Sequence, residues 1–222
     1  MRNISFFNIM GRKTKMAFFL SLSVMMTVLS ACADHNDMYD AGIKVGNILL
    51  SNNTLVTPAG YNPETMDAVG VIFYASADTA IAVATIELGD LCFADSIGRI
   101  DGTSKDQYSL DGKTSTAALM MSDTFSPAAH ACYEYSPKLT GWHLPSAGEL
   151  RVLSVNLNRV GESMRVISGT GFSDVQYLSS SEDNSSSNSA VINCYCVSLI
   201  KGITVSVPKT EKHRVRPVIL IH

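Results

Sequence analysis

An apolar run near the N-terminus limits which part of this chain can fold as a globular domain. The run extends from Met16 to Leu29, is interrupted only by three hydroxyl residues, and follows a basic segment at residues 12–15. It is shorter than the roughly 20 residues that span a bilayer, and its length and positive flank are typical of a secretory signal peptide. We therefore expect residues 1–31 to be removed, which leaves 191 of the 222 residues to fold.

The apolar run ends in Leu29-Ser30-Ala31-Cys32, which resembles the lipobox that lipoprotein signal peptidase recognises. Small residues before the cysteine let the chain enter a narrow protease site, and the thiol accepts the diacylglycerol. We expect Cys32 to carry the lipid and residues 32–42, which are polar and acidic, to form a tether. The alternative is an ordinary secretory signal followed by a chance cysteine. With a lipid on Cys32, the protein belongs to the cell envelope, anchored to the outer membrane.

The charge balance argues against two classes of partner, nucleic acids and anionic lipid surfaces. The chain has 17 basic and 20 acidic residues, and residues 1–31 contain four of the basic ones and none of the acidic ones, so the mature net charge is −7. An acidic protein is a poor binder of nucleic acid and of anionic lipid surfaces. Contact with the membrane is therefore expected through the lipid alone. The remaining length suits a single domain over residues 43–222.

Short segments rich in β-branched residues predict seven strands. The predicted strands are residues 43–50, 69–74, 81–88, 175–181, 191–200, 203–207 and 214–221. Turn signals predict a long loop at residues 98–113, and a Ser/Asn-rich composition predicts another at residues 182–189.

Capping patterns predict two helices between these strands. Ser126 is followed by Pro127, the usual residue for a first helical position. Ser146 and Glu149 have the spacing of a capping box, and leucines at helical spacing follow until Gly161, where we expect the helix to end.

Four cysteines remain besides Cys32, namely Cys92, Cys132, Cys194 and Cys196. An exported protein can keep disulfides, but four thiols allow three pairings, and the sequence does not select one. Cys194 and Cys196 lie two apart in a predicted strand, so both should face the same side. We favour buried apolar thiols over disulfides, and a zinc site last, because no matching Cys or His pair accompanies them.

Several segments together resemble a known family. Residues 141–150, Gly-Trp-His-Leu-Pro-Ser-Ala-Gly-Glu-Leu, resemble the Gly-Trp-x-Leu-Pro-Thr-x-x-Glu-Leu core of the DUF1566/Lcl and FISUMP-type domains of secreted and surface proteins. Residues 214–218, Arg-Val-Arg-Pro-Val, resemble the closing motif of that family, and residues 46–51, 178–182 and 195–201 resemble weaker parts of it. The similarity extends over residues 43–221.

This resemblance implies an α+β fold of the C-type-lectin-like kind, which is also used by formylglycine-generating-type domains. Two helices would pack on twisted, mostly antiparallel sheets with long loops. The sequence departs from the family pattern at Leu178, where a tryptophan is usual, and at Ser189-Ala190-Val191, which replaces Asn-Ala-Trp. Two aromatic residues are thus missing beside residues 182–189, which puts a shared ligand site in doubt.

The polar cluster Glu182, Asp183 and Asn184 is the candidate ligand-binding site. Carboxylates with an amide oxygen suit calcium, although a solvated loop is the simpler alternative. The sugar-binding motifs of C-type lectins are absent.

Four further residues are expected to have structural roles. In the family pattern Trp142 belongs to the core, with sugar stacking as the alternative, and Glu149 is the capping-box carboxylate. Arg214 and Arg216 lie two apart in the last predicted strand and should share a face. An arginine on a packed face needs a carboxylate, and the family-like layout suggests an Arg216–Glu182 or Arg216–Glu149 ion pair.

No catalytic, phosphate-binding or metal-binding motif is present, and no two histidines have metal-pair spacing, so we expect no enzyme activity and no cofactor. The sequence favours a binding or adhesion module of the cell envelope, with a glycan or a surface protein as its partner. The alternatives are an accessory subunit of a surface or fimbria-like assembly, and an envelope enzyme that uses Cys194 and Cys196.

Overall fold

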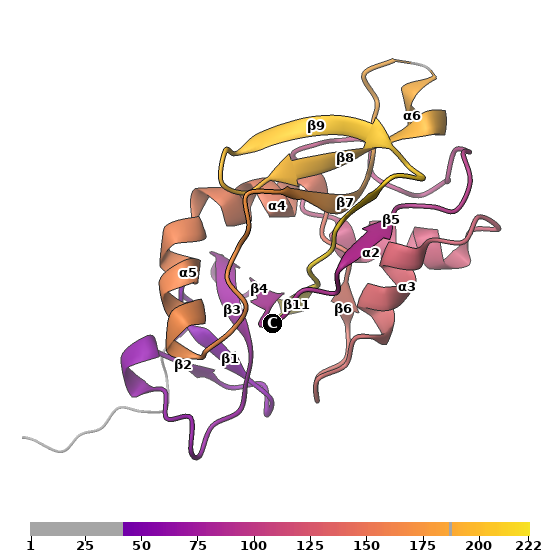
Figure 1. Cartoon of the computed structure of the whole chain (residues 1–222). Helices are drawn as coiled ribbons and strands as arrows, with labels where there is room; N and C mark the ends of the chain where they lie inside the picture. The colour runs from indigo at the N-terminus through magenta and orange to yellow at the C-terminus, as the bar shows by residue number, and fades with distance from the viewer. Residues whose placement is uncertain (1–41, 187) are drawn as a thin grey trace, which may run out of the picture. The chain divides into compact units, whose positions relative to one another are not determined.

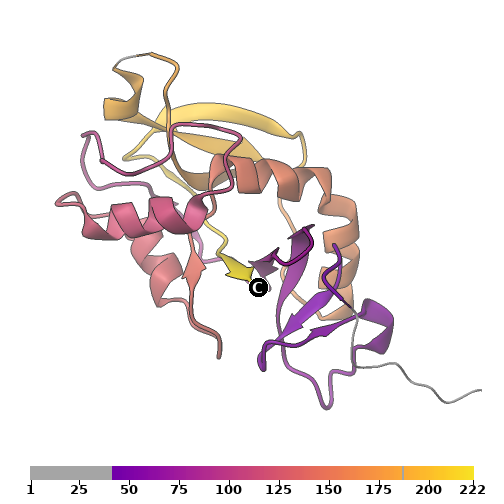
Figure 2. The ribbon, with the colours of Figure 1, turned by 180° about the vertical axis from the view of Figure 1, so that it is seen from behind.

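A computed structural model describes residues 42–186 and 188–222. The predicted signal peptide, Cys32 and most of the tether lie outside these residues. The described chain forms two sheets with helices packed against them (Figures 1 and 2). The fold is α+β, as the sequence predicts, but it contains five α-helices in this part of the chain where the sequence predicts two.

The first sheet has six strands and is antiparallel throughout, in the order β2-β1-β3-β4-β11-β6. Its strands are β1 (Ile48–Leu50), β2 (Leu55–Val56), β3 (Ala68–Ala75), β4 (Ala80–Ala84), β6 (Trp142–His143) and β11 (Val218–Ile221). The last strand therefore lies inside the sheet, between β4 and the edge strand β6. This pairing joins the two ends of the described chain in one hydrogen-bonded layer.

The second sheet has five strands in the order β5-β10-β7-β8-β9. Its strands are β5 (Asp90–Cys92), β7 (Gln176–Glu182), β8 (Asn193–Ser198), β9 (Ile203–Pro208) and β10 (Lys212–Arg214). Only the short β10–β7 pairing is parallel. The strand β9 forms one edge of this sheet.

The prediction of one closing strand over residues 214–221 is wrong. The segment divides into β10 in the second sheet and β11 in the first. Between them Val215 exchanges backbone hydrogen bonds with Leu88 and Gly89, and Pro217 has no N–H for a ladder. The chain thus crosses from one sheet to the other at Arg216.

The five α-helices are α2 (Gly112–Met121), α3 (Pro127–Glu134), α4 (Ala147–Val155), α5 (Leu157–Val166) and the short α6 (Ser189–Ile192), and a 3-10 turn, η1 (Pro58–Gly60), precedes β3. Ser126 caps α3 through Ala129, and Ser146 and Glu149 form the predicted capping box of α4. The predicted helix end at Gly161 is wrong, because the break falls at Asn156, whose side chain donates to the backbone oxygen of Phe73.

The core lies on both faces of the central strands. On one side α4 packs on β3, β7 and β8, and α5 packs on β3. On the other side α2 packs on β6 and β7, and α3 packs on β5 and β6. The alternation of β8 shows this division directly. Tyr195 and Val197 belong to the first cluster, whereas Cys194 and Cys196 belong to the second, which confirms that the two cysteines face the same side.

Candidate functional site

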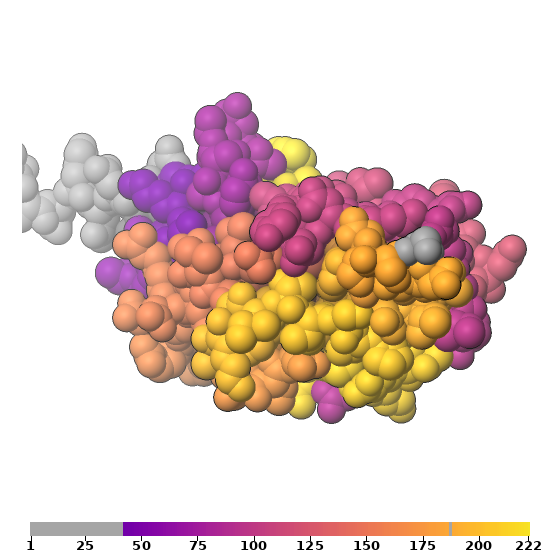
Figure 3. All heavy atoms as spheres, turned by 90° about the horizontal axis from the view of Figure 1, so that it is seen from above, coloured from indigo at the N-terminus to yellow at the C-terminus, as the bar shows by residue number. Residues whose placement is uncertain are grey.

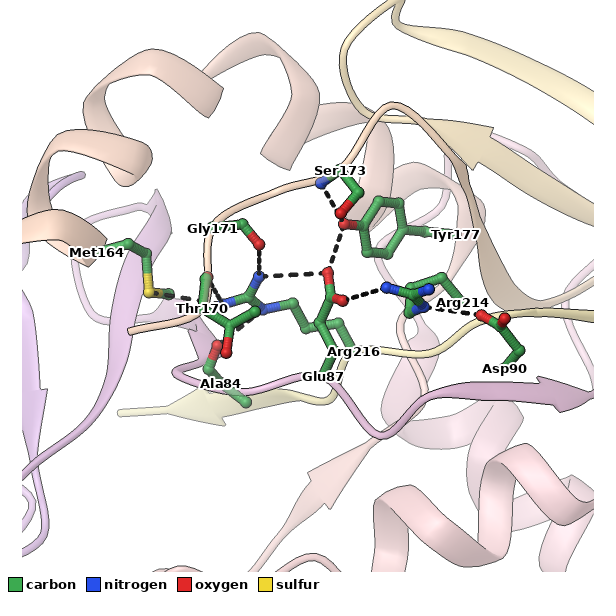
Figure 4. A network of polar contacts seen from close by, with 10 residues as sticks. All are labelled: Ala84, Glu87, Asp90, Met164, Thr170, Gly171, Ser173, Tyr177, Arg214 and Arg216. Atoms are coloured by element: carbon green, nitrogen blue, oxygen red, sulfur yellow. Dashed lines mark hydrogen bonds and ion pairs between the residues drawn. The ribbon is translucent and has the colours of Figure 1, made fainter. Parts of the chain in front are cut away.

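Arg216 lies at the crossing between the sheets and is only 1% exposed. Its guanidinium donates to three backbone oxygens, those of Ala84, Thr170 and Gly171, at 2.7 to 3.1 Å (Figure 4). Its Nη1 also lies 3.7 Å from Oε1 of Glu87. Burial lowers the pKa of Arg216 from its usual value, and the Glu87 carboxylate opposes that shift.

Glu87 connects Arg216 to a second arginine and to a tyrosine (Figure 4). Arg214 contacts Oε2 of Glu87 at 2.6 Å and Asp90 at 2.8 Å. The Tyr177 hydroxyl donates to Oε1 of Glu87 at 2.6 Å. Burial, together with this hydrogen bond, raises the pKa of Tyr177 to about 12. We call Glu87, Arg214, Arg216 and Tyr177 the Glu87 network. The charged groups of this network find their partners within the protein, and they come from segments of both sheets. We therefore interpret the Glu87 network as a structural link between the two sheets.

The predicted ion pair of Arg216 with Glu182 or Glu149 is therefore wrong. The prediction fails because the chain crosses between the sheets at Arg216. The crossing directs the guanidinium toward the loop after β4 and away from the end of β7. Glu149 stays with its own helix, where Oε2 accepts from the backbone N–H of Ser146 at 2.9 Å. Its Oε1 accepts from the N–H of Gly112, which fixes the start of α2 against α4.

The prediction that Glu182 begins a solvated loop is also wrong, and its burial gives no support to the alternative of a ligand-binding residue there. The strand β7 extends through Glu182, whose side chain is fully buried. Lys209, equally buried, lies 2.5 Å from its Oε1, and the N–H of Ile100 donates to the same oxygen. Glu182 is therefore one half of an internal ion pair under residues 98–100.

Asp183 and Asn184 do not form a cation site with it. Burial favours a higher pKa for Asp183, but hydrogen bonds from Ser206 and Ser185 outweigh it and lower the pKa. The Asn184 side chain instead lies beside the Tyr195 hydroxyl. Within residues 42–186 and 188–222, no group of three or more His, Cys, Asp or Glu residues is arranged to hold a metal ion.

The four described cysteines are free thiols. Cys132, Cys194 and Cys196 are buried, and Cys92 is half-buried. Burial raises the pKa of each of the three buried thiols, which keeps them protonated at neutral pH. Because the thiolate is the reactive form, burial and the raised pKa disfavour Cys194 and Cys196 as nucleophiles.

Trp142 is also internal. It lies in β6, is 1% exposed, and meets Tyr135 edge-on with ring centroids 5.1 Å apart. Its ring is therefore not available for stacking on a sugar.

An exposed aromatic side chain is found instead at Tyr108, in the loop before α2. It stands at the rim of a hollow of about 260 Å³, which we call the Tyr108 hollow. The hollow is lined by Tyr108, Gly148, Arg151, Val152, Ser154, Val155 and Gly202. Segments from three parts of the chain thus meet here: the loop near residue 108, the helix α4 and the turn between β8 and β9. Figure 3 shows the face on which these magenta, orange and yellow segments adjoin.

The position of Tyr108 depends on the Ser-Ala-Gly-Glu segment at the start of α4. The N–H of Tyr108 donates to Oδ1 of Asp106, and the Ser146 hydroxyl donates to the backbone oxygen of Ser109 at 2.7 Å. A Cβ on Gly148 would lie 2.5 Å from the backbone of Tyr108. Only glycine at this position allows the loop to pack so closely on the helix.

Arg151 lies one turn further along α4 and is fixed from two sides. Its guanidinium carbon is 4.8 Å from the centroid of the Tyr108 ring, and Nη1 donates to the Thr204 hydroxyl on β9 at 3.1 Å. Among the described residues, no carboxylate lies within 4.0 Å of this guanidinium. The hollow therefore presents the guanidinium of Arg151, fixed in position and without a carboxylate partner, beside an aromatic ring.

Sequence reasoning missed both Tyr108 and Arg151. Tyr108 falls in the predicted loop 98–113, and Arg151 is a polar position on a predicted amphipathic helix. Neither position carries a local signal of binding, because their proximity arises from tertiary packing.

Comparison of the sequence with protein-family models gave no match, and comparison with curated proteins gave no similar protein. The resemblance of residues 141–150 and 214–218 to the DUF1566/Lcl and FISUMP-type domains therefore stays a prediction from the sequence. The function must be argued from the geometry of the molecule.

Proposed function

We propose that this protein is a cell-envelope lipoprotein whose folded domain binds a ligand at the Tyr108 hollow. The observation that carries the binding proposal is the pairing of Tyr108 with Arg151. Tyr108 is 65% exposed, and its ring is held against a guanidinium without a counter-ion. Exposed aromatic and arginine side chains that are fixed in place lose little entropy when a ligand binds.

The lipid anchor is supported by the order of signals at the N-terminus. A basic segment, an apolar run and Leu29-Ser30-Ala31-Cys32 follow one another with the spacing of a lipoprotein signal peptide. No helix in the described part of the chain is both long and apolar enough to cross a bilayer. An outer-membrane anchor would display the Tyr108 hollow at an envelope surface.

The C-type-lectin-like fold is part of this proposal. It is supported by the Gly-Trp-x-Leu-Pro and Arg-Val-Arg-Pro-Val segments, which occur in the order of the family pattern. The mixed architecture of helices on two sheets is compatible with it.

The anchor is tested by the substitution Cys32→Ser. In detergent phase partitioning we expect the variant to remain in the aqueous phase, because it lacks the thiol that is the proposed lipid acceptor. A variant that still enters the detergent phase would refute the lipoprotein assignment.

The binding proposal is tested on a glycan array and by pull-down from envelope extracts, with the full chain purified in detergent. The informative variant is Tyr108→Ala, and Tyr133→Ala is its matched control, because Tyr133 is 64% exposed but lies on α3. We expect binding to be lost in the first variant and retained in the second. Binding that survives Tyr108→Ala would place the ligand elsewhere on the domain.

A further inference from the structure

The charge of the Tyr108 hollow distinguishes it from two other hollows of the described surface that also contain an arginine. Arg151 is the only charged residue that lines it. In the hollow beside Lys44, by contrast, Arg159 is accompanied by Glu162. The hollow beside Arg99 likewise contains Asp101 and Asp123. The Tyr108 hollow thus combines a single positive charge with no acidic lining residue, on a chain that is acidic overall.

The guanidinium of Arg151 is oriented before any ligand arrives. The Tyr108 ring and the Thr204 hydroxyl restrict it, and Nη1 makes its only side-chain hydrogen bond to the described residues. An arginine has five N–H donors, so most of them remain open to a ligand. A planar fork of such donors matches a carboxylate, which it binds with two parallel hydrogen bonds.

The remainder of the hollow suits a small ring with both polar and apolar faces. Val155 is 85% exposed, and together with Val152 and Tyr108 it provides apolar surface. The Ser154 hydroxyl donates to the backbone oxygen of Leu199, so its lone pairs can accept a hydrogen bond from a ligand. The volume of about 260 Å³ lies just below the usual range for small-molecule sites and fits a group of the size of one sugar ring.

We propose that the ligand of the Tyr108 hollow is a glycan with a carboxylate-bearing sugar, whose carboxylate is bound by Arg151 and whose C–H face lies against Tyr108 and Val155. This inference rests on the proposed binding function and assigns the chemical class of its ligand. Such a carboxylate occurs in hexuronic acids and in nonulosonic acids such as sialic acid. Both sources present the same group to Arg151.

The test uses two pairs of probes that differ only or mainly in the carboxylate, titrated into the full chain in detergent and followed by NMR. One pair is sialyllactose and its methyl ester, and the other is trigalacturonate and its methyl ester. We expect the acidic member of one pair to bind at least about tenfold more tightly than its neutral partner, because a charge-assisted hydrogen bond is lost in the latter. The pair that responds identifies the source of the carboxylate.

Variants at Arg151 then assign the effect to this residue. Arg151→Gln should weaken the acidic probe about 10- to 100-fold, and Arg151→Lys should restore part of the loss, since it keeps the charge without the planar fork. Arg165→Gln on α5 is the control, because it removes the same charge from an exposed position outside the hollow. An unchanged melting temperature in each variant shows that the fold is intact.

The outcomes separate this inference from the proposed function. Equal affinity for both members of each pair, or full affinity in Arg151→Gln, overturns the carboxylate assignment. If the neutral probes bind and Tyr108→Ala abolishes that binding, the binding function stands without it. No binding of any of the four probes also overturns the carboxylate assignment, and an empty glycan array and pull-down would then remove the binding function too.

Discussion

Arg216 and Arg151 each lie against an aromatic ring, but their surroundings differ. The guanidinium carbon of Arg216 is 4.3 Å from the Phe172 ring centroid, and that of Arg151 is 4.8 Å from the Tyr108 centroid. Arg216 is buried and has Glu87 and three backbone oxygens as partners. Arg151 lies at the surface with one neutral hydroxyl as its hydrogen-bond partner.

This comparison shows that stacking on a ring does not by itself reveal what an arginine does. A buried guanidinium must be fully paired, because an unpaired charge away from water is costly. At the surface, water oxygens accept from the guanidinium N–H groups, so the acceptors of a ligand can take the place of that water. The arginines of the Glu87 network therefore have partners within the protein, whereas the guanidinium of Arg151 in the Tyr108 hollow keeps donors for a ligand.

The largest effect is expected for Arg216→Ala. The substitution leaves Glu87 short of one cation and removes the donors of three backbone oxygens, and breaking a buried pair typically costs about 3–5 kcal/mol. We expect a reduction of this size in the free energy of unfolding, measured by urea denaturation. A midpoint equal to that of the parent chain would show that the Glu87 network is not a structural clamp.

A smaller and pH-dependent effect is expected for Tyr177→Phe. Loss of the hydrogen bond to Glu87 should cost about 1.5–3 kcal/mol at neutral pH, as for other bonds to charged groups. The pKa of Tyr177 is raised in the folded protein from its ordinary value of 10 to about 12. Its stabilisation is therefore complete below pH 10 and is lost as the pH rises through 12.

The difference in stability between the parent chain and Tyr177→Phe should accordingly shrink above pH 10. Urea midpoints of both proteins at pH 9 and pH 11 measure it, at about 25 °C. A constant difference over this interval would contradict the raised pKa.

The Tyr108 hollow is more directly disturbed by Gly148→Ala. The added Cβ would lie 2.5 Å from the Tyr108 backbone, so the loop must move away from α4. We expect ligand binding to be lost, with a destabilisation of about 1–3 kcal/mol, as for other overpacked positions. Gly161→Ala is the control, since no atom lies within 4 Å of its added Cβ.

That control should leave binding intact and stabilise the chain by about 0.5–1 kcal/mol, because alanine is favoured over glycine inside a helix. Unchanged binding in Gly148→Ala would show that the position of Tyr108 does not matter.

The smallest effect on stability is expected for Arg151→Ala. An exposed cation–π contact is worth about 0.5–1 kcal/mol, so the urea midpoint should move little. A loss comparable to that of Arg216→Ala would show that Arg151 is a second structural arginine. It would then remove the contrast between the two sites.

The starts of α3 and α4 and most strands could be predicted because their causes are local. The side chain of Ser146 reaches the N–H of Glu149 three residues away, and this spacing is visible in the sequence. The alternation that places Cys194 and Cys196 on one face is equally local. The missed helix α2 begins at Gly112 after a turn signal, and Glu149 from α4, not a residue of its own first turn, accepts from its first N–H.

The partners of the charged residues were not predictable in the same way. Glu182 follows a strand and precedes polar residues, which is typical of a loop, yet Lys209 and Ile100 enclose it from distant parts of the chain. The candidate site shifted for the same reason, since Tyr108 and Arg151 become neighbours only when the loop packs on α4.

By itself, the sequence determined the α+β class, the capped starts of α3 and α4 and the alternation of β8, because these depend on residues a few positions apart. The tertiary structure decided which carboxylate meets which arginine, where the chain crosses between the sheets, and which aromatic ring stays exposed. Those features depend on contacts between distant segments. The residues next to an arginine in the sequence are the same whether its carboxylate partner belongs to the protein or to a ligand, so the sequence alone does not distinguish the two cases.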